Sequence, residues 1–270
     1  MRTRTWFVRC LVIAVSLLSA ASAQAQFGAP QPAVGEVYRV ELYGGLWNPT
    51  PEITISSAQL GIAGSDIDVV ADLGILQKRF PEFRAVLRPA RKHKFRIQYV
   101  PIGYDSDALL DRSIVFNGIR YDIGIPVTTT ARWDTWRFGY EYDFVYRERW
   151  FAGLILEAKY TNVEVTLDSP FASEFIRARA PVPAVGGIVR AYPAENWGLT
   201  FELTGFKLPE GIDENHRGEY IDIDIYTTLN FTDNVGFQFG YRSVNLIYQV
   251  SQDAGDVKLR GFYYGGLVRF

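Results

Sequence analysis

The sequence predicts an all-β fold, an antiparallel transmembrane β-barrel of about ten strands. Three observations lead to this prediction. Apolar and polar residues alternate with period two, short and long connections alternate along the chain, and the last residue, Phe270, is aromatic. Period-two alternation is typical of strands with one apolar and one polar face, and amphipathic helical periodicity is nearly absent.

A predicted secretory signal peptide occupies residues 1–25. Three arginines and a short apolar core over 11–18 are followed by small residues that suit cleavage. The core is too short to cross a bilayer, so it is not an anchor. The only cysteine, Cys10, would leave with this segment, and the mature chain would contain neither a disulfide nor a thiolate site. We therefore predict one exported domain over 26–270.

Ten segments show the alternation expected of strands. In the clearest, Asp134–Phe144, one parity carries aromatic residues such as Trp136 and Phe138, and the other carries mostly polar ones. The predicted strands are Val37–Trp47, Glu82–Arg88, Lys94–Tyr99, Asp134–Phe144, Trp150–Val165, Val182–Tyr192, Leu199–Phe206, Glu219–Phe231, Val235–Tyr248 and Lys258–Phe270.

The connections between these strands are of two kinds. Short ones alternate strictly with long ones, which is typical of outer-membrane barrels with short periplasmic turns and long extracellular loops. The short connections are 89–93, 146–149, 192–196 and 232–234, and the long ones are 48–81, 102–128, 167–180, 207–217 and 250–257.

Two of the long connections contain strand-like runs. Residues 112–123 carry an Asn117-Gly118 pair, which is a strong hairpin signal, and residues 65–71 alternate weakly. We interpret them as hairpin extensions beyond the membrane. The alternative is that they add two barrel strands, giving twelve, and a barrel of eight strands is also considered.

The orientation of the faces separates a membrane barrel from a soluble periplasmic β-sandwich, the alternative fold. In a membrane barrel the apolar faces meet lipid and the polar faces line the lumen, whereas a sandwich buries its apolar faces. Aromatic residues near strand ends suit interfacial girdles, although sheets are enriched in aromatic residues anyway. These residues are Trp47, Trp133, Trp136, Tyr146, Trp150, Tyr192 and Trp197.

Charged residues of both signs occupy the polar faces of the strands. Because an unpaired buried charge is costly, they are expected to fill a narrow lumen as a network of ion pairs. The predicted luminal network contains Arg39, Glu41, Arg84, Arg96, Arg137, Glu141, Asp143, Glu157, Lys159, Arg190, Glu202, Asp222, Asp224, Arg242 and Arg269.

The end of the chain carries a further pattern. Tyr263, Gly265, Val268 and Phe270 resemble the C-terminal assembly signal of bacterial outer-membrane proteins. This resemblance implies insertion into the outer membrane by the barrel-assembly machinery, with outer-membrane lipid and lipopolysaccharide as partners. The overall plan is similar to small OmpA/OmpW-type barrels, although ten strands departs from the eight usual there.

Candidate catalytic and metal-binding residues are few. His93 lies in a basic turn. His216 lies near Asp213, Glu214 and Glu219, where it would be a general base, a weak metal ligand or, as we favour, part of a solvated loop. Acidic groups in rim loops suit a divalent cation or, as we favour, solvent; they are Asp105, Asp107, Asp111, Asp253 and Asp256.

The sequence therefore predicts a non-enzymatic outer-membrane barrel. It contains no glycine-rich phosphate loop, zinc spacing or catalytic signature, so no cofactor is expected. The net charge of −2 does not favour a nucleic-acid partner. We expect a filled, salt-bridged lumen and a structural or surface-binding role through the outer loops. The alternatives are a narrow pore for small solutes and a rim enzyme that acts on lipid or peptide.

Overall fold

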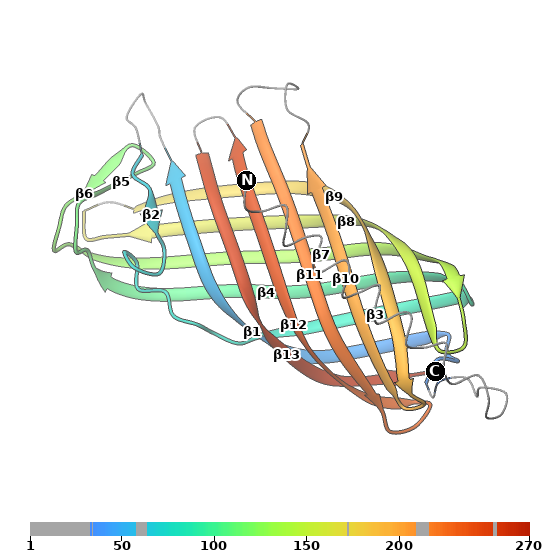
Figure 1. The fold of residues 1–270 in the computed structure, drawn as a ribbon. Coiled ribbons are helices and arrows are strands. Elements are labelled where there is room, and N and C mark those ends of the chain that lie inside the picture. The colour runs from blue at the N-terminus through green and yellow to red at the C-terminus, as the bar shows by residue number, and fades with distance from the viewer. Residues whose placement is uncertain (1–32, 34, 58–63, 172, 209–215, 251–252) are drawn as a thin grey trace, which may run out of the picture. The chain divides into compact units, whose positions relative to one another are not determined.

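Ten long antiparallel strands form a closed barrel in the computed structural model (Figure 1). The structure describes residues 33, 35–57, 64–171, 173–208, 216–250 and 253–270. The barrel strands are β1 (Val40–Ser57), β3 (Phe80–Ala90), β4 (His93–Leu109), β7 (Pro126–Tyr146), β8 (Trp150–Asp168), β9 (Ser173–Ala194), β10 (Trp197–Lys207), β11 (His216–Asn230), β12 (Val235–Val250) and β13 (Asp253–Arg269).

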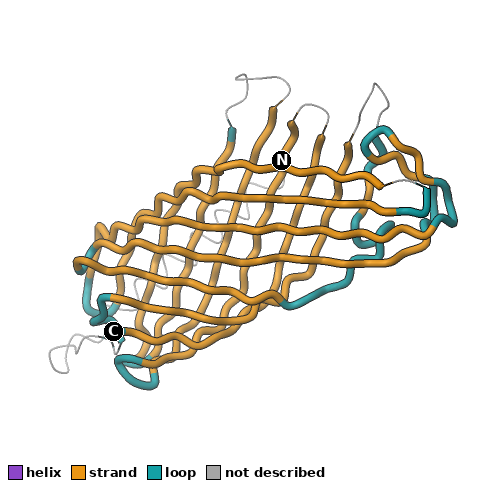
Figure 2. Tube along the Cα trace, turned by 180° about the vertical axis from the view of Figure 1, so that it is seen from behind, coloured by secondary structure: helices purple, strands orange, loops and turns teal. Residues whose placement is uncertain are grey.

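The first and last strands close the barrel. β13 pairs with β1 over seventeen residues, from Arg269 opposite Glu41 to Asp253 opposite Ser57. Figure 2 shows strands around the whole barrel wall, and the described residues contain no helix long and apolar enough to cross a membrane. Closure into ten strands confirms the predicted fold class and excludes the β-sandwich alternative.

Three short strands lie at the end of the barrel opposite the C-terminus (Figure 1): β2 (Ile67–Asp68) extends the sheet of the wall, and β5 (Ile114–Phe116) and β6 (Ile119–Tyr121) form a separate sheet. β2 pairs with Thr54 and Ile55 near the C-terminal end of β1, and β5 pairs with β6 in a sheet of its own. Asn117 and Gly118 join β5 to β6 with φ values of 50° and 79°, as a type I′ hairpin turn requires. The hairpin is therefore an extension, and the twelve-strand alternative is wrong.

Most strands are longer than predicted. β8 ends at Asp168 and β9 begins at Ser173, so the predicted long loop 167–180 is mostly strand. The same holds for 250–257, because β13 begins at Asp253. The predicted signal peptide lies outside the described residues.

The apolar face of the wall changes sides along the barrel. We call the half next to the short turns the lower half, and the half next to β2, β5 and β6 the upper half. In lower β4, Phe95 and Ile97 face outward, with 48% and 45% of their surfaces exposed, whereas in upper β4 Val100 and Ile102 are buried inside. The lower half thus has an apolar exterior, and the upper half has an apolar interior.

β13 shows the same change of sides. In lower β13, Phe262 and Tyr264 face outward. A few residues nearer the upper half, Leu259 is buried inside and Arg260 faces outward. Lipid around the lower half and water around the upper half account for this inversion, because each medium favours the opposite outer face.

A hydrophobic core fills the upper half and continues under β2 and the β5–β6 hairpin. Ile67, Ile114 and Phe116 are fully buried beneath these caps. Arg112 fastens the cap with hydrogen bonds of 2.8 and 2.6 Å to Asp72, and these bonds lower the pKa of the Asp72 carboxyl. The upper half is therefore packed like the core of a soluble β-barrel.

Shortening Leu259 to alanine is expected to lower the free energy of unfolding by about 2–5 kcal/mol, because the cavity left in this core cannot fully collapse. Leu259 is 0% exposed, whereas Leu76 is 79% exposed on the same half. Leu76→Ala is the control and should change stability by less than about 0.5 kcal/mol. Equal effects in urea unfolding of the detergent-solubilised protein would contradict a packed upper core.

The predicted aromatic girdle is only partly external. Trp136 and Trp197 face outward, with 41% and 39% of their surfaces exposed. Trp47, Trp133 and Tyr192 instead point into the barrel, where 2%, 9% and 5% of their surfaces remain exposed. The girdle assignment is wrong for these three, because their strand parity places them on the inner face. Trp150 and Tyr146 are half-buried.

Candidate functional site

The lower interior gathers fourteen of the fifteen predicted network residues. Each has its side chain buried or nearly buried inside the barrel. Arg39 is the exception, because β1 begins only at Val40 and the Arg39 side chain is exposed. Its backbone instead joins the closing seam, where the Arg39 N–H donates to the Phe270 carbonyl at 2.7 Å.

Arg96 lies at the centre of the network. Its guanidinium donates to both carboxylate oxygens of Glu202, at 3.0 and 2.9 Å. It also approaches Glu141 and Glu157, each at 3.3 Å. β4 and β10 are separated by three strands in the sheet, so Arg96 bridges the lumen rather than neighbouring strands.

Arg242 forms a second bridge across the lumen. From β12 it contacts both carboxylate oxygens of Glu82 on β3 at 3.0 Å, and Asp224 on β11 at 2.8 and 3.1 Å. The Tyr263 hydroxyl donates to the other Asp224 oxygen at 2.8 Å. Bidentate contacts of this kind orient both partners and satisfy the buried carboxylates.

A third group joins β7, β8 and β11. Arg137 and Lys159 both contact Glu157 and Asp222, and the shortest of these four contacts is Arg137 to Asp222 at 2.8 Å. Lys94 extends the network toward the short turns, because its ammonium lies 2.6 Å from Glu141 and 3.1 Å from a second carboxylate, that of Asp143 on β7. The charges in this half are therefore paired rather than solvated.

The segment before β1 closes the lower mouth of the barrel. Glu36 lies inside it and contacts Arg190 at 3.2 Å and Arg88 at 3.7 Å, on opposite parts of the wall. The Tyr38 ring lies between the guanidinium groups of Arg88 and Arg269, at 5.3 and 5.2 Å. We call residues 35–38 the mouth segment.

Sequence reasoning missed four charged members of this interior: Glu36, Glu82, Arg88 and Lys94. A signal existed for three of them, because Glu82 and Arg88 share the parity of Arg84, and Lys94 shares that of Arg96. Glu36 lies outside any alternating run, so nothing in the pattern marked it.

Above the charged network the interior becomes apolar. A cavity of about 60 Å³ remains there, lined by aliphatic and aromatic side chains that include Ile102, Tyr104 and Leu259. Apolar cavities of this kind stay dry. Ion pairs below and apolar packing above therefore oppose a continuous path of water.

The candidate catalytic and metal-binding residues are dispersed. His93 lies on the outer face of β4, and β11 begins at His216. The His216 side chain, Asp213 and Glu214 lie outside the described part, and Glu219 is half-buried on β11. Asp105 binds Arg132 at 2.6 Å, and Asp256 binds Lys258 at 2.9 Å. Among the residues with described positions, no three metal-ligating side chains gather.

The other rim acids behave in the same way. Asp107 accepts a hydrogen bond from Thr128 at 2.6 Å, Asp111 is exposed, and the Asp253 side chain falls outside the described part. The described rim acids that have printed partners thus contact basic or hydroxyl side chains of this chain, as Asp105 does with both Arg132 and Lys78.

No family model and no curated protein matches the sequence. Among solved structures, the outer-membrane protease OmpT from Escherichia coli is similar over 92% of this chain and 100% of its own, with a TM-score of 0.58 and 9% identity. The toluene transporter TodX of Pseudomonas putida matches over 86% and 90%, with a TM-score of 0.37 and 7% identity.

The attachment invasion locus protein Ail of Yersinia pestis matches over 85% of this chain and 99% of its own, with a TM-score of 0.36 and 8% identity. At such identities the likeness concerns the fold alone. The fold of this chain is that of a bacterial outer-membrane β-barrel, as the closing pattern at its C-terminus had suggested.

Proposed function

We propose that the protein is an integral outer-membrane barrel with its short turns in the periplasm and its upper half above the outer leaflet. The apolar exterior of the lower half supports this placement, because side chains such as Phe138 and Leu156 are about half exposed there, at 48% and 55%. The polar exterior of the upper half suits water. Export by the predicted signal peptide, residues 1–25, belongs to this proposal.

The proposed role is structural or surface-binding, with a barrel closed to solutes. One observation carries it: the mouth segment, the ion-pair network and the apolar upper core follow one another along the interior, and the cavity of about 60 Å³ in the upper part is lined mostly by apolar side chains. Because packed side chains occupy the lumen, the upper half of the barrel is a rigid platform. Binding would then occur on the β5–β6 hairpin and the outer loops, with no cofactor.

Outer-membrane lipid and lipopolysaccharide are the proposed surroundings of the lower half, and the barrel-assembly machinery is the proposed partner during insertion. The alternative of a rim enzyme depends on His216 and its acidic neighbours. The proposed structural or surface-binding role does not use His216, so His216→Ala should leave surface binding and assembly unchanged. The alternative of a narrow pore is tested directly below.

The wild-type protein is expected to be electrically silent in a planar lipid bilayer, because paired charges and a dry apolar core block ions. A wide porin inserted under the same conditions is the positive control. Gel electrophoresis of boiled and unboiled samples establishes that the silent protein is folded, because a folded barrel changes its mobility on heating (the heat-dependent gel shift). Reproducible single-channel steps from folded protein would reject the closed barrel and favour the narrow pore.

A further inference from the structure

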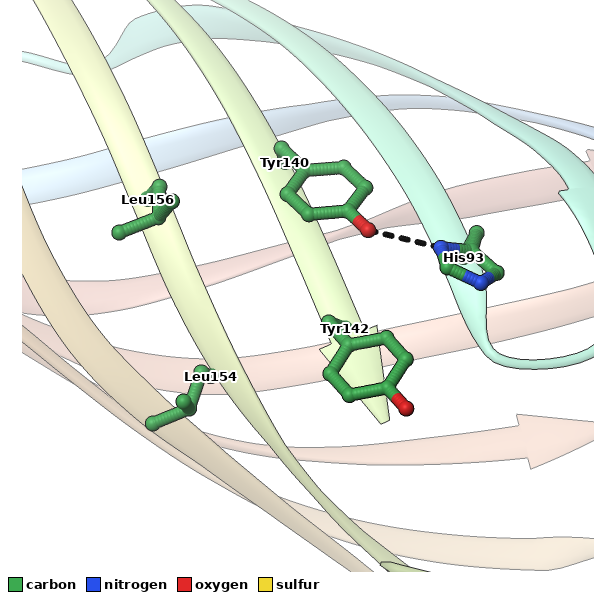
Figure 3. A pocket seen from close by; sticks show the side chains of 5 residues that line it. All are labelled: His93, Tyr140, Tyr142, Leu154 and Leu156. Atoms are coloured by element: carbon green, nitrogen blue, oxygen red, sulfur yellow. Dashed lines mark hydrogen bonds between the residues drawn. The ribbon is translucent and has the colours of Figure 1, made fainter. Parts of the chain in front are cut away.

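A hollow on the outer face of the lower half has one polar and one apolar end. It is lined by His93 on β4, Tyr140 and Tyr142 on β7, and Leu154 and Leu156 on β8, and it is an open surface hollow of about 470 Å³ (Figure 3). The network and the mouth segment lie inside the wall, so this hollow is a separate feature.

The polar end is an organised set of hydrogen-bonding groups. His93 Nδ1 lies 2.7 Å from the Tyr140 hydroxyl, and the His93 ring lies 5.2 Å from the ring of Tyr142. Because Tyr140 engages Nδ1, Nε2 is the ring nitrogen that remains available to a ligand among the described residues. Figure 3 shows Nε2 and the Tyr142 hydroxyl on the same side of the hollow.

The turn before β4 adds positive charge at this end. Arg91 and Lys92 precede His93 and are exposed. The turn is anchored, because the Asp143 N–H donates to the Lys92 carbonyl at 2.9 Å and Arg88 donates to the Arg91 carbonyl at 2.9 Å. The backbone of Lys92 is therefore held next to His93, and its exposed side chain is open to a ligand at this end of the hollow.

The apolar end continues up the wall. A second hollow of about 590 Å³ shares Tyr140 and Leu156 with the first and extends over β8 and β9. The outward residues Ala158 and Pro183 lie at its lining. Small side chains between larger ones leave a shallow depression in the outer surface, where the two hollows adjoin. We call the two hollows together the β7–β8 groove.

We propose that the β7–β8 groove binds one anionic phospholipid of the periplasmic leaflet. Its phosphate accepts hydrogen bonds from Lys92 and His93, and one acyl chain lies along Leu154 and Leu156. Basic groups attract anionic headgroups at a membrane surface, and the groove offers the tail an apolar bed. The inference rests on the proposed membrane placement, since only that placement puts the basic turn at the periplasmic leaflet.

Charge favours a phospholipid over a second copy of the chain. A second copy that places apolar surface in this groove would cover the Lys92 ammonium and the His93 Nε2, which have no acceptor among the described residues, and burying polar groups in this way is unfavourable. A phosphate at the same place supplies the missing acceptor.

The test is native mass spectrometry of the full-length barrel in non-ionic detergent with added phosphatidylglycerol. The double variant Lys92→Gln/Tyr140→Phe removes the charge and the hydroxyl that holds His93. Lys78→Gln/Tyr241→Phe is the matched control, because Lys78 and Tyr241 are exposed elsewhere on the barrel. We expect wild type and control to retain one phosphatidylglycerol, and the test variant to retain about tenfold less.

Equal retention of phosphatidylglycerol by the test variant would overturn the proposal, and so would equal binding of diacylglycerol, which has no phosphate. A dimer mass that the test substitutions abolish would also overturn it, because a second copy would then occupy the groove. The heat-dependent gel shift shows whether each variant is folded. If the double variant does not fold, Lys92→Gln alone is used, since its side chain is exposed in a turn. Recovery of wild type in a soluble periplasmic fraction would instead overturn the proposed membrane placement, so the two failures are distinguishable.

Discussion

Replacing Arg242 with methionine is expected to lower the free energy of unfolding by about 3–5 kcal/mol, because it leaves Glu82 and Asp224 buried without their cation. Arg242 is 2% exposed and supplies four hydrogen bonds to these two carboxylates. Methionine keeps much of the volume of the side chain, so the loss reflects the unpaired charges more than a cavity.

The measurement is equilibrium unfolding of the detergent-solubilised protein, followed by tryptophan fluorescence. Arg120→Met is the matched control, because Arg120 and Asp122 form a pair whose side chains are 71% and 64% exposed. An exposed pair of this kind contributes about 0–1 kcal/mol. Neutralising the carboxylates as well, in Arg242→Met/Glu82→Gln/Asp224→Asn, should recover part of the loss; no recovery would contradict the electrostatic cause.

Strand parity predicts which side chains enter the lumen, but not which of them meet. Arg242 and Asp224 stand on the polar parity of their strands, and both were predicted to be luminal. The Arg242–Glu82 contact joins residues 160 positions apart. Its formation depends on the tilt and stagger of a closed barrel, which no local pattern contains. Glu82 shares the parity of Arg84, so parity reasoning alone would have included it.

The upper half was missed for a physical reason. Alternation continues through β4 past Tyr99, but the apolar positions move from Phe95 and Ile97 to Val100 and Ile102. A strand prediction that follows one apolar parity ends where the parity changes. The change marks the proposed passage from lipid to water outside the barrel. It therefore indicates the membrane boundary and not the end of a strand.

The mouth segment had no comparable signal. Glu36 lies before the first predicted strand, Val37–Trp47, and Tyr38 lies at the start of that strand; their partners Arg88 and Arg190 are supplied by β3 and β9. Arg39 shows the same limit from the other side. It lies within the predicted strand Val37–Trp47 and was therefore counted into the lumen, but the strand begins one residue later, at Val40.

Replacing Phe270 with serine is expected to remove most of the folded protein from the outer membrane, because we propose that its ring is the part recognised during assembly. The ring faces outward and is 70% exposed, so it contributes little to packing. The backbone of the residue has a second role. The Phe270 N–H donates to the Val40 carbonyl at 2.9 Å, and the Val40 N–H donates to the Phe270 carbonyl at 3.0 Å.

These two roles predict different results for two variants. Phe270→Ser keeps the backbone hydrogen bonds of the closing seam, whereas deletion of Phe270 removes them together with the ring. If recognition of the ring dominates, both variants lose membrane insertion to the same extent, as measured by fractionation and the heat-dependent gel shift. If the seam dominates, only the deletion fails.

Phe231 provides the control for the serine variant. It also is 70% exposed, and it follows β11 at the same end of the barrel. Phe231→Ser removes an equal aromatic surface from the proposed interface without touching the C-terminus, so it should insert normally. Poor insertion of Phe231→Ser would mean that any exposed ring at this level is needed, and it would remove the case for Phe270 as an assembly signal. Normal insertion of both serine variants would leave the closing hydrogen bonds as the contribution of Phe270.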